Sequence, residues 1–303
     1  MTRRRVFWVF GSVLVLASAA IGGFLTRPVE FFNVYTETRL LLSGAETRTT
    51  TVEECRIHYY VMGPASGPPV VLVHGLGGRS EDWRNLAPYL IRAGFRVYLP
   101  DLLGYGQSER PGSFSYSVSD EAGIVVGFLD ALGLKQADLG GWSMGGWIVQ
   151  RIAADHPERV NRLMLFDSAG LLVKPDWDTG LFTPRSPSEL AQLDVLLMPH
   201  PPPVPGFVAK DILRNLTNNA WIIHRAMASM LTGRDATDGL LPRLKMPVLV
   251  VWGQLDRITP LSEGETIHRL IPQSHLEVIP ECGHLAASMC ARQIGPGVVA
   301  FLQ

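Results

Sequence analysis

The sequence predicts an α/β protein whose mostly parallel, doubly wound sheet carries an inserted helical lid. Two observations indicate the sheet. Continuous apolar runs such as Val70-Val71-Leu72-Val73 are typical of strands buried on both faces of a parallel sheet. These runs alternate along the chain with stretches of helical periodicity. A third observation indicates the lid, because residues 171–243 lose the alternation and contain proline clusters between apolar helical patches.

The overall composition is typical of a packed globular enzyme. The 303 residues are 47% hydrophobic and 18% charged, and the formal net charge is -1. There is no basic stripe along the chain, so we expect no nucleic-acid partner. The cysteines Cys55, Cys282 and Cys290 lack the paired spacing of a zinc site, and we expect neither a metal nor a cofactor. We interpret them as small buried hydrophobes, with a bridge between Cys282 and Cys290, the nearest pair, as the alternative.

The amino terminus is predicted to be a membrane-targeting segment. Three arginines at positions 3–5 precede Val6 to Leu25, an uncharged stretch about as long as a bilayer-spanning helix. Residues 1–27 are therefore expected to be a transmembrane anchor, and the alternative is a signal peptide that is cleaved after Ala19. The apolar stretch continues past Ala19, which favours the anchor. The preceding arginines predict that the main domain lies on the extracytoplasmic side, or that the protein is secreted or periplasmic if the signal is cleaved.

The remaining elements are expected in the following order. Residues 28–46 are interpreted as a stalk or short helix near the membrane, and the globular domain begins at residue 47. Residues 47–52 and 56–61 are rich in β-branched and aromatic residues and are expected to form an antiparallel pair. The parallel strands are predicted at residues 70–73, 96–100, 137–140, 159–166, 247–252 and 276–279. Helices are predicted at residues 81–93, 117–132, 147–154, 262–270 and 285–302, with lid helices at 190–198, 207–216 and 221–231.

One five-residue stretch carries the strongest chemical signal. Gly141-Trp142-Ser143-Met144-Gly145 fits the pattern G-x-S-x-G, in which the glycines allow a sharp turn from a strand into a helix and expose the serine hydroxyl. The pattern is loose by itself, but here a strand-like run precedes it and helical periodicity follows it. We therefore predict that Ser143 is a nucleophile. The alternative is a small-residue turn that only tightens a strand and helix pair.

A serine nucleophile needs a base, and the base needs a carboxylate that holds its tautomer. His284 follows the last predicted strand, at the same edge of the sheet as Ser143, and is the predicted base. Asp256 follows the preceding strand and is the predicted acid, with Asp167 as the alternative. Of the other histidines, His74 is the nearest rival as the base, but we expect it to order its own loop.

The tetrahedral intermediate of acyl transfer needs hydrogen-bond donors for its negative oxygen. The backbone N–H groups of Leu76 and Met144 are predicted to supply this oxyanion hole, because one follows the His74-Gly75 loop and the other follows the nucleophile. Trp142, His74 and Gly75 are predicted to line the substrate pocket. Asp101 and the glycine-rich turn after it are interpreted as a structural loop beside the site.

These motifs make residues 47–303 resemble the α/β-hydrolase superfamily of serine esterases and lipases. Within that superfamily the chain looks like the membrane-anchored monoacylglycerol lipase branch. The resemblance implies hydrolysis of lipid esters with Ser143, Asp256 and His284 as the triad, and Trp142 departs from the histidine or small residue common in such elbows. The motifs that carry the resemblance are His74-Gly75, Gly104-Tyr105-Gly106-Gln107-Ser108, Ser143-Met144-Gly145-Gly146, Ser168-Ala169-Gly170-Leu171, Ser186-Pro187-Ser188-Glu189-Leu190 and Glu281-Cys282-Gly283-His284.

The expected function is that of a serine carboxylester hydrolase that cleaves apolar or lipid esters through an acyl-enzyme. A carbon–carbon bond hydrolase of meta-cleavage products is the alternative within the same fold. Such enzymes are typically soluble and continue their first loop with Pro-Gly-Ala, whereas this loop continues with Gly77-Gly78-Arg79-Ser80. Serine at position 143 argues against the halide and epoxide chemistry of relatives with an aspartate nucleophile. A hydrolase-like ligand-binding receptor is the alternative from another class, and a complete triad argues against it.

Overall fold

The computed structural model describes residues 21–303 and builds them around one eight-stranded sheet with the strand order β1-β2-β4-β3-β5-β6-β7-β8. β1 and β2 pair antiparallel, β2 pairs antiparallel with β4, and the remaining neighbours are parallel, which confirms the predicted mostly parallel sheet. The strands are β1 Glu46–Val52, β2 Cys55–Met62, β3 Pro69–Val73, β4 Arg96–Pro100, β5 Ala137–Trp142, β6 Val160–Phe166, β7 Val248–Gly253 and β8 His275–Ile279.

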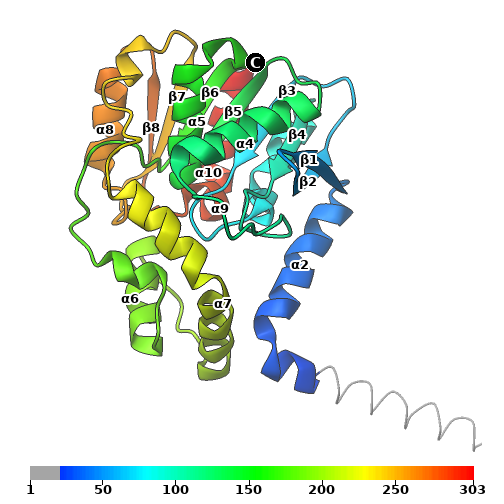
Figure 1. The fold of residues 1–303 in the computed structure, drawn as a ribbon, viewed down its shortest axis with the longest axis vertical. Coiled ribbons are helices and arrows are strands. Elements are labelled where there is room, and N and C mark those ends of the chain that lie inside the picture. The colour runs from blue at the N-terminus through cyan, green and yellow to red at the C-terminus, as the bar shows by residue number, and fades with distance from the viewer. Residues whose placement is uncertain (1–20) are drawn as a thin grey trace, which may run out of the picture.

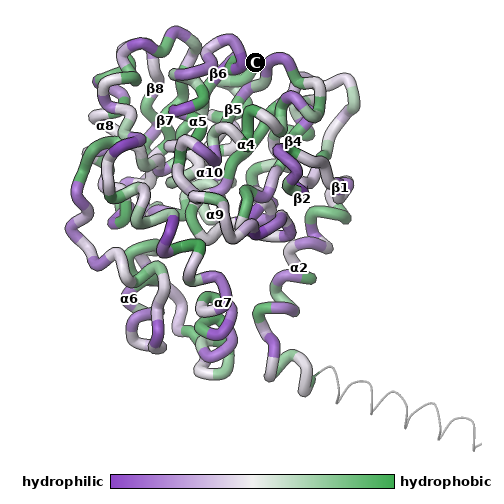
Figure 2. The backbone as a smooth tube through the Cα atoms, viewed as in Figure 1, coloured by the Kyte–Doolittle hydropathy of each residue, from purple (hydrophilic) through white to green (hydrophobic). Residues whose placement is uncertain are grey.

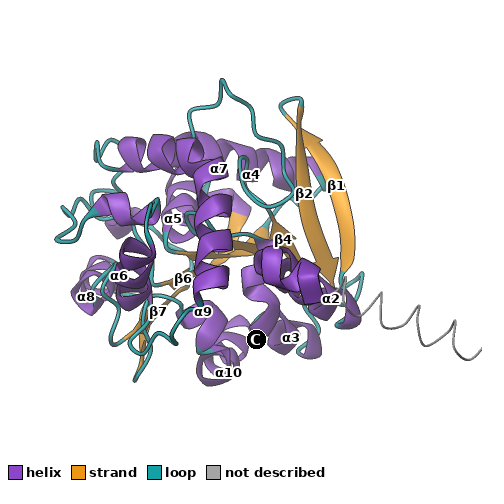
Figure 3. Ribbon diagram, turned by 90° about the horizontal axis from the view of Figure 1, so that it is seen from below, coloured by secondary structure: helices purple, strands orange, loops and turns teal. Residues whose placement is uncertain are grey.

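Helices cover both faces of the sheet, as Figure 3 shows. One face packs against α4 (Val118–Ala131), α5 (Met144–Asp155) and α8 (Leu261–Leu270), and the other against α3 (Ala87–Arg92), α9 (Ala286–Met289) and α10 (Ala291–Leu302). Val71 and Val73 of β3 belong to the first core, whereas Val70 and Leu72 belong to the second. Because successive side chains of a strand point to opposite faces, a strand covered on both sides is apolar throughout. The apolar residues accordingly follow the central strands in Figure 2.

Two predicted helices are interrupted in the structure, and two others are joined into one. The helix expected at residues 81–93 is a 3₁₀ turn, η1 (Ser80–Asn85), followed by α3, because Pro88 at the start of α3 cannot continue the preceding hydrogen-bond ladder. The closing helix is interrupted at Cys290, between α9 and α10. In the insertion, the two patches predicted at 207–216 and 221–231 form one helix, α7 (Gly206–Met230). The polar residues between the patches include neither glycine nor proline, so nothing breaks the helix there.

The insertion between β6 and β7 contains η3 (Thr179–Phe182), α6 (Pro187–Leu197) and α7. Figure 1 shows α6 and α7 together beyond one end of the sheet, on the same side of the molecule as the start of α2 (Pro28–Leu42). The insertion therefore lies where it can cover the edge of the sheet formed by the carboxyl ends of the parallel strands.

α2 occupies the segment for which we expected a stalk or short helix, and it is docked rather than free. The backbone N–H of Val29 donates to Asp211 Oδ2 of α7 at 3.0 Å. The Arg79 guanidinium, at the start of η1, donates to Asn33 Oδ1 at 2.6 Å. α2 therefore bridges the insertion and the loop that follows β3.

The predicted membrane segment lies mostly outside the described residues, which include only Ile21 to Leu25 of the stretch from Val6 to Leu25. Over residues 21–303, no helix combines the length and the apolar character that a membrane crossing requires. The anchor therefore stays a prediction.

Cys282 and Cys290 form a disulfide, which corrects our expectation that the cysteines are unpaired hydrophobes. The short helix α9 turns the chain back, so the two Cα atoms lie 6.4 Å apart, within the range that a disulfide spans. Sequence spacing could not show this turn. Cys55 is a half-buried free thiol.

Reduction of the Cys282–Cys290 bond is expected to lower the midpoint of thermal unfolding. Closing a loop with a sequence separation of 8 removes chain entropy from the unfolded state, and this stabilises the fold by about 2.5 kcal/mol. Thermal unfolding of the wild type with and without reductant measures the effect. Cys290→Ser should match the reduced wild type in both conditions, and Cys55→Ser should keep the full response to reductant. An unchanged midpoint on reduction would contradict a structural role for this bond.

Candidate active site

The site is centred on the turn between β5 and α5. Ser143 has φ 55° and ψ −120°, a backbone conformation that costs energy for a residue other than glycine and is typical of a nucleophile elbow. The neighbouring glycines permit the close approach of several backbones. A Cβ on Gly141 would lie 2.2 Å from the carbonyl oxygen of Gly145, and a Cβ on Gly145 would lie 2.2 Å from the carbonyl oxygen of Val73. Any larger residue at either position would collide with backbone atoms.

The structure brings Ser143, His284 and Asp256 into one hydrogen-bonded chain. His284 Nε2 lies 2.9 Å from Ser143 Oγ, and His284 Nδ1 lies 2.8 Å from Asp256 Oδ2. The three residues come from the β5–α5 turn, the loop after β8 and the loop after β7, and all three are buried. Sheet topology unites them, because the carboxyl ends of these parallel strands lie at one edge.

The partners of the histidine are themselves held in place. Asp256 Oδ1 accepts hydrogen bonds from the backbone N–H groups of Ile258 and Thr259, at 2.8 and 3.1 Å. Thr259 Oγ1 also donates to Asp256 Oδ2 at 2.9 Å. On the other side, Trp142 Nε1 donates to the carbonyl oxygen of His284 at 2.6 Å. The carboxylate and the histidine loop are therefore fixed before a substrate arrives.

Asp167, the alternative acid, does not bond to His284. Its Oδ1 accepts from the N–H of Gly253 at 2.7 Å, and its Oδ2 accepts from the N–H of Ala286 at 3.1 Å. Burial, and then the neighbouring charge of Asp256, raise the pKa of this carboxyl well above its ordinary value. Asp167 therefore ties the end of β7 to the start of α9, next to the site.

Leu76 and Met144 present open backbone donors beside Ser143. Within the described chain, neither backbone N–H donates to a protein acceptor. Met144 is the first residue of α5, where backbone N–H groups have no partner inside the helix and the helix dipole favours negative charge. Both residues also line the cavity onto which Ser143 opens. The arrangement fits a developing oxyanion.

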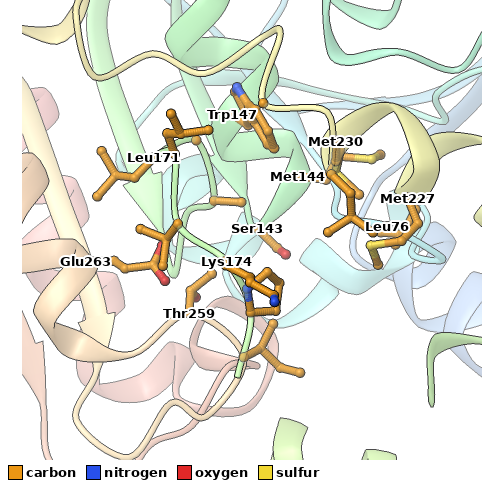
Figure 4. A pocket seen from close by; sticks show the side chains of 18 of the residues that line it. Leu76, Ser143, Met144, Trp147, Leu171, Lys174, Met227, Met230, Thr259 and Glu263 are labelled. Carbon is orange, nitrogen blue, oxygen red and sulfur yellow. The ribbon is translucent and has the colours of Figure 1, made fainter. Parts of the chain in front are cut away.

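The cavity beside Ser143 has a volume of about 590 Å³. Figure 4 shows Leu76, Met144 and Met227 on one side of Ser143 and Glu263 on the other. Most of the lining is apolar, and the insertion contributes a large share of it. These apolar residues include Leu76, Met144, Trp147, Leu171, Leu172, Val173, Trp177, Phe182, Met227, Met230, Leu231 and Ile258.

The three residues predicted to line the pocket are absent from the lining of this cavity, so that prediction is wrong for it. Trp142 belongs to the core on the opposite face of the sheet from Met144, because the sharp turn at Ser143 sends the two side chains in different directions. His74 is fully buried, accepts the N–H of Leu102 at 3.0 Å through Nε2, and bonds through Nδ1 to the carbonyl oxygen of Gly75 at 2.8 Å. Burial lowers the pKa of His74, which suits this neutral, loop-ordering role.

Gly75 supports the elbow rather than the pocket. A Cβ at this position would lie 3.1 Å from Ser143 Cβ and 3.1 Å from the carbonyl oxygen of Trp142, so glycine allows the loop to pass close to the nucleophile. Sequence reasoning missed three further polar residues that line the cavity, Thr259, Lys174 and Glu263. Of the three, only Thr259 could have been found from the sequence, because it lies three residues after the predicted acid Asp256. In the part of the chain described, no group of three His, Cys, Asp or Glu side chains is placed to hold a metal ion.

Comparison with known proteins gives the family. A family model described as the alpha/beta hydrolase fold matches residues 68–195 and 231–287, and the intervening gap falls on α7 and the loop before it. The chain therefore belongs to the α/β-hydrolase family, and it is a hydrolase. This confirms the superfamily predicted from the motifs, whereas the monoacylglycerol lipase branch stays a prediction.

The relatives include two kinds of hydrolase. Lipase 1 of Psychrobacter immobilis is 29% identical over 245 residues, which cover 75% of this chain and 74% of the lipase. The 2-hydroxymuconate semialdehyde hydrolase of Pseudomonas putida is 34% identical over 240 residues, which cover 72% of this chain and 81% of that enzyme. Among solved structures, a membrane phospholipase A described as a bacterial virulence factor aligns with a TM-score of 0.82 at 27% identity, and covers 97% of each chain.

Proposed function

We propose that this protein is a serine esterase that hydrolyses carboxylic esters of apolar or lipid substrates through an acyl-enzyme. The observation that carries the proposal is the bonded chain Ser143–His284–Asp256 at the edge of a largely apolar cavity of about 590 Å³. Hydrogen-bonded serine, histidine and aspartate are the parts that acyl transfer requires. An alkyl chain that enters the cavity is buried against apolar side chains and is removed from water.

The geometry supports the following proposed role for each group. Ser143 Oγ attacks the ester carbonyl carbon while His284 Nε2 takes its proton, and Asp256 stabilises the imidazolium that forms. The N–H groups of Leu76 and Met144 meet the oxyanion. When the tetrahedral intermediate collapses, the ester C–O bond breaks and His284 returns the proton to the departing alcohol. Water then attacks the acyl-enzyme by the same route and releases the acid.

The substrate class rests on the cavity and on the relatives together. A lipase and a membrane phospholipase A are among the proteins that this chain resembles, and both names fit an apolar acyl site. A second candidate is a carbon–carbon bond hydrolase of meta-cleavage products, which is favoured by the 34% identity to the 2-hydroxymuconate semialdehyde hydrolase. The apolar lining favours the ester.

A substrate panel tests this proposal. Initial rates are measured on acyl esters of increasing chain length, on monoacylglycerol and phospholipid, and on a meta-cleavage dienoate. We expect kcat/KM to rise with chain length by roughly 3- to 4-fold for each added methylene until the cavity is full, because each buried CH₂ contributes about 0.8 kcal/mol. Turnover of the dienoate that exceeds turnover of every ester would instead select the second candidate. The relative rates on monoacylglycerol and phospholipid decide the branch.

We further propose that residues 1–27 anchor the protein in a membrane with the domain on the extracytoplasmic side. The disulfide between Cys282 and Cys290 supports that side, because disulfides persist in oxidising compartments. The neighbouring membrane phospholipase A is compatible with an anchor. Mass analysis of the native amino terminus separates the two forms, since a cleaved signal peptide would leave a chain that begins at Ala20.

A further inference from the structure

One charged side chain in the cavity wall has no role in the mechanism above. Glu263 lies in the first turn of α8 and lines the same cavity as Ser143. Its carboxyl is half-buried, and over residues 21–303 it forms neither a hydrogen bond nor an ion pair. A carboxyl group that is held against apolar residues without a partner costs stability. Such a group is a candidate for contact with a ligand.

The charges around Glu263 have mostly the same sign. Asp256 from the loop after β7, and Asp176 and Asp238 from the insertion, all add negative potential at this carboxyl. Lys174 also lines the cavity, but its side chain is exposed. The cavity wall near Glu263 is therefore negative, and a substrate group that reaches it meets a hydrogen-bond acceptor and an anion.

We propose that Glu263 determines specificity by admitting esters whose buried end is neutral, hydroxyl-bearing or cationic, and by rejecting esters whose buried end is a carboxylate. The inference rests on the proposed esterase function and names the substrate class for it. A carboxylate accepts hydrogen bonds from hydroxyl and ammonium groups, whereas two carboxylates that share an apolar cavity repel each other. At an effective dielectric constant of about 20, a like charge about 8 Å away disfavours binding roughly 30-fold.

The protonation state of Glu263 gives the selectivity a pH dependence. Burial, and then the charge of Asp256, raise the pKa of Glu263 to about 7. Above that pH the side chain is charged and excludes anions, and below it the neutral acid no longer repels them. A carboxylate on the substrate stays charged down to about pH 5, because its ordinary pKa is about 4 to 5. Discrimination between anionic and neutral esters should therefore fade between pH 9 and pH 6.

The test compares esters that differ only in a terminal tag. Six-carbon acyl esters carry a terminal carboxylate, hydroxyl or ammonium group, and a second series carries the same tags on the alcohol, because either half of an ester can enter the cavity. The measured quantity is the ratio of kcat/KM for the carboxylate-tagged ester to that for the hydroxyl-tagged ester. A change in catalytic power that affects all esters equally cancels in this ratio.

For the wild type at pH 9 we expect, in at least one series, that kcat/KM for the carboxylate-tagged ester is about 30-fold lower than kcat/KM for the hydroxyl-tagged ester. This difference follows from the like-charge repulsion. Glu263→Gln should raise the ratio by about 10-fold or more at pH 9 and should remove its pH dependence. Lowering the pH to 6 should have the same effect on the wild type. Glu265→Gln, on the exposed side of the same helix, is the matched control and should leave the ratio unchanged. A ratio that Glu263→Gln leaves unchanged in both series would overturn the proposal.

Direct binding separates this inference from the proposed function. The same tagged esters are titrated into Ser143→Ala and into the double variant Ser143→Ala/Glu263→Gln by calorimetry at pH 9. Relief of anion exclusion in the double variant would support the role of Glu263 even if no ester were hydrolysed. Equal affinities of the two variants for the carboxylate-tagged esters would overturn the role of Glu263, even if the wild type were an active esterase.

Discussion

Replacing Ser143 with alanine is expected to lower kcat for ester hydrolysis by about 10⁶-fold while the protein stays folded. Ser143 Oγ lies 2.9 Å from His284 Nε2. Among the described residues, no other serine oxygen lies within hydrogen-bond distance of His284. Without Ser143 Oγ no acyl-enzyme can form. The measurement is the initial rate on a short acyl ester, together with an unfolding curve. Ser262→Ala, which changes an exposed serine on α8, is the matched control and should retain full activity. An alanine variant at Ser143 with more than about a hundredth of the wild-type rate would refute the nucleophile.

The same assay distinguishes the two aspartates. Asp256→Asn should lower kcat by about 10⁴-fold, because the amide no longer holds the correct tautomer of His284. Asp167 lies against the backbone of Gly253 and Ala286, so Asp167→Asn should mainly lower the free energy of unfolding, since its new NH₂ group would face a backbone N–H. If Asp167→Asn lost the greater part of kcat and Asp256→Asn did not, the assignment of the acid would be reversed.

The second large effect is expected at the elbow. Gly145→Ala should lower the free energy of unfolding by more than about 3 kcal/mol or prevent folding, because overpacking against atoms that cannot move is costly. The new Cβ would lie 2.2 Å from the carbonyl oxygen of Val73 and 2.4 Å from that of His74. Both oxygens belong to the backbone at the end of β3, where Val73 pairs with Gly141 of β5. Denaturant unfolding and the yield of soluble protein measure the loss.

Gly123→Ala provides the matched control for the elbow substitution. Gly123 is exposed in the middle of α4, and apart from its chain neighbours and the nearby backbone of its own helix no atom lies within 4 Å of the position that its Cβ would take. Alanine at this site should raise the free energy of unfolding by about 0.5–1 kcal/mol, because it restricts the unfolded chain. Equal unfolding midpoints for the two alanine variants would show that the close approach at Gly145 is not tight.

Local patterns carried the prediction of the fold. Apolar runs, turn residues and helical periodicity are short-range properties, and each strand of the sheet was predicted from one of them. The elbow is equally local, because the sharp turn at Ser143 depends on the glycines beside it. Predicting which residues meet Ser143 required only that parallel strands end at one edge, and the structure places Asp256 and His284 there. These features depend on residues close in sequence or on the direction of the strands.

Other features depend on packing between distant segments, which local patterns do not specify. The docking of α2 on Asp211 arises where the insertion meets the amino-terminal helix. The disulfide depends on the turn made by α9. Each is decided by contacts whose geometry follows from the assembled core rather than from a repeating pattern.

The substrate cavity shows most clearly which features follow from local sequence and which follow from tertiary packing. The sequence by itself determined an α/β-hydrolase with a serine at its elbow. Strand and helix periodicity, and the small residues that the elbow needs, are visible in short stretches of sequence. The tertiary structure decided which side chains line the cavity. In the structure Trp142 packs in the core and His74 bonds to the backbone of the loop after β4, so neither lines the cavity. Glu263 of α8 lines the cavity beside Ser143. Side chains far apart in sequence become neighbours only through strand register and helix packing, and specificity arises from those neighbours.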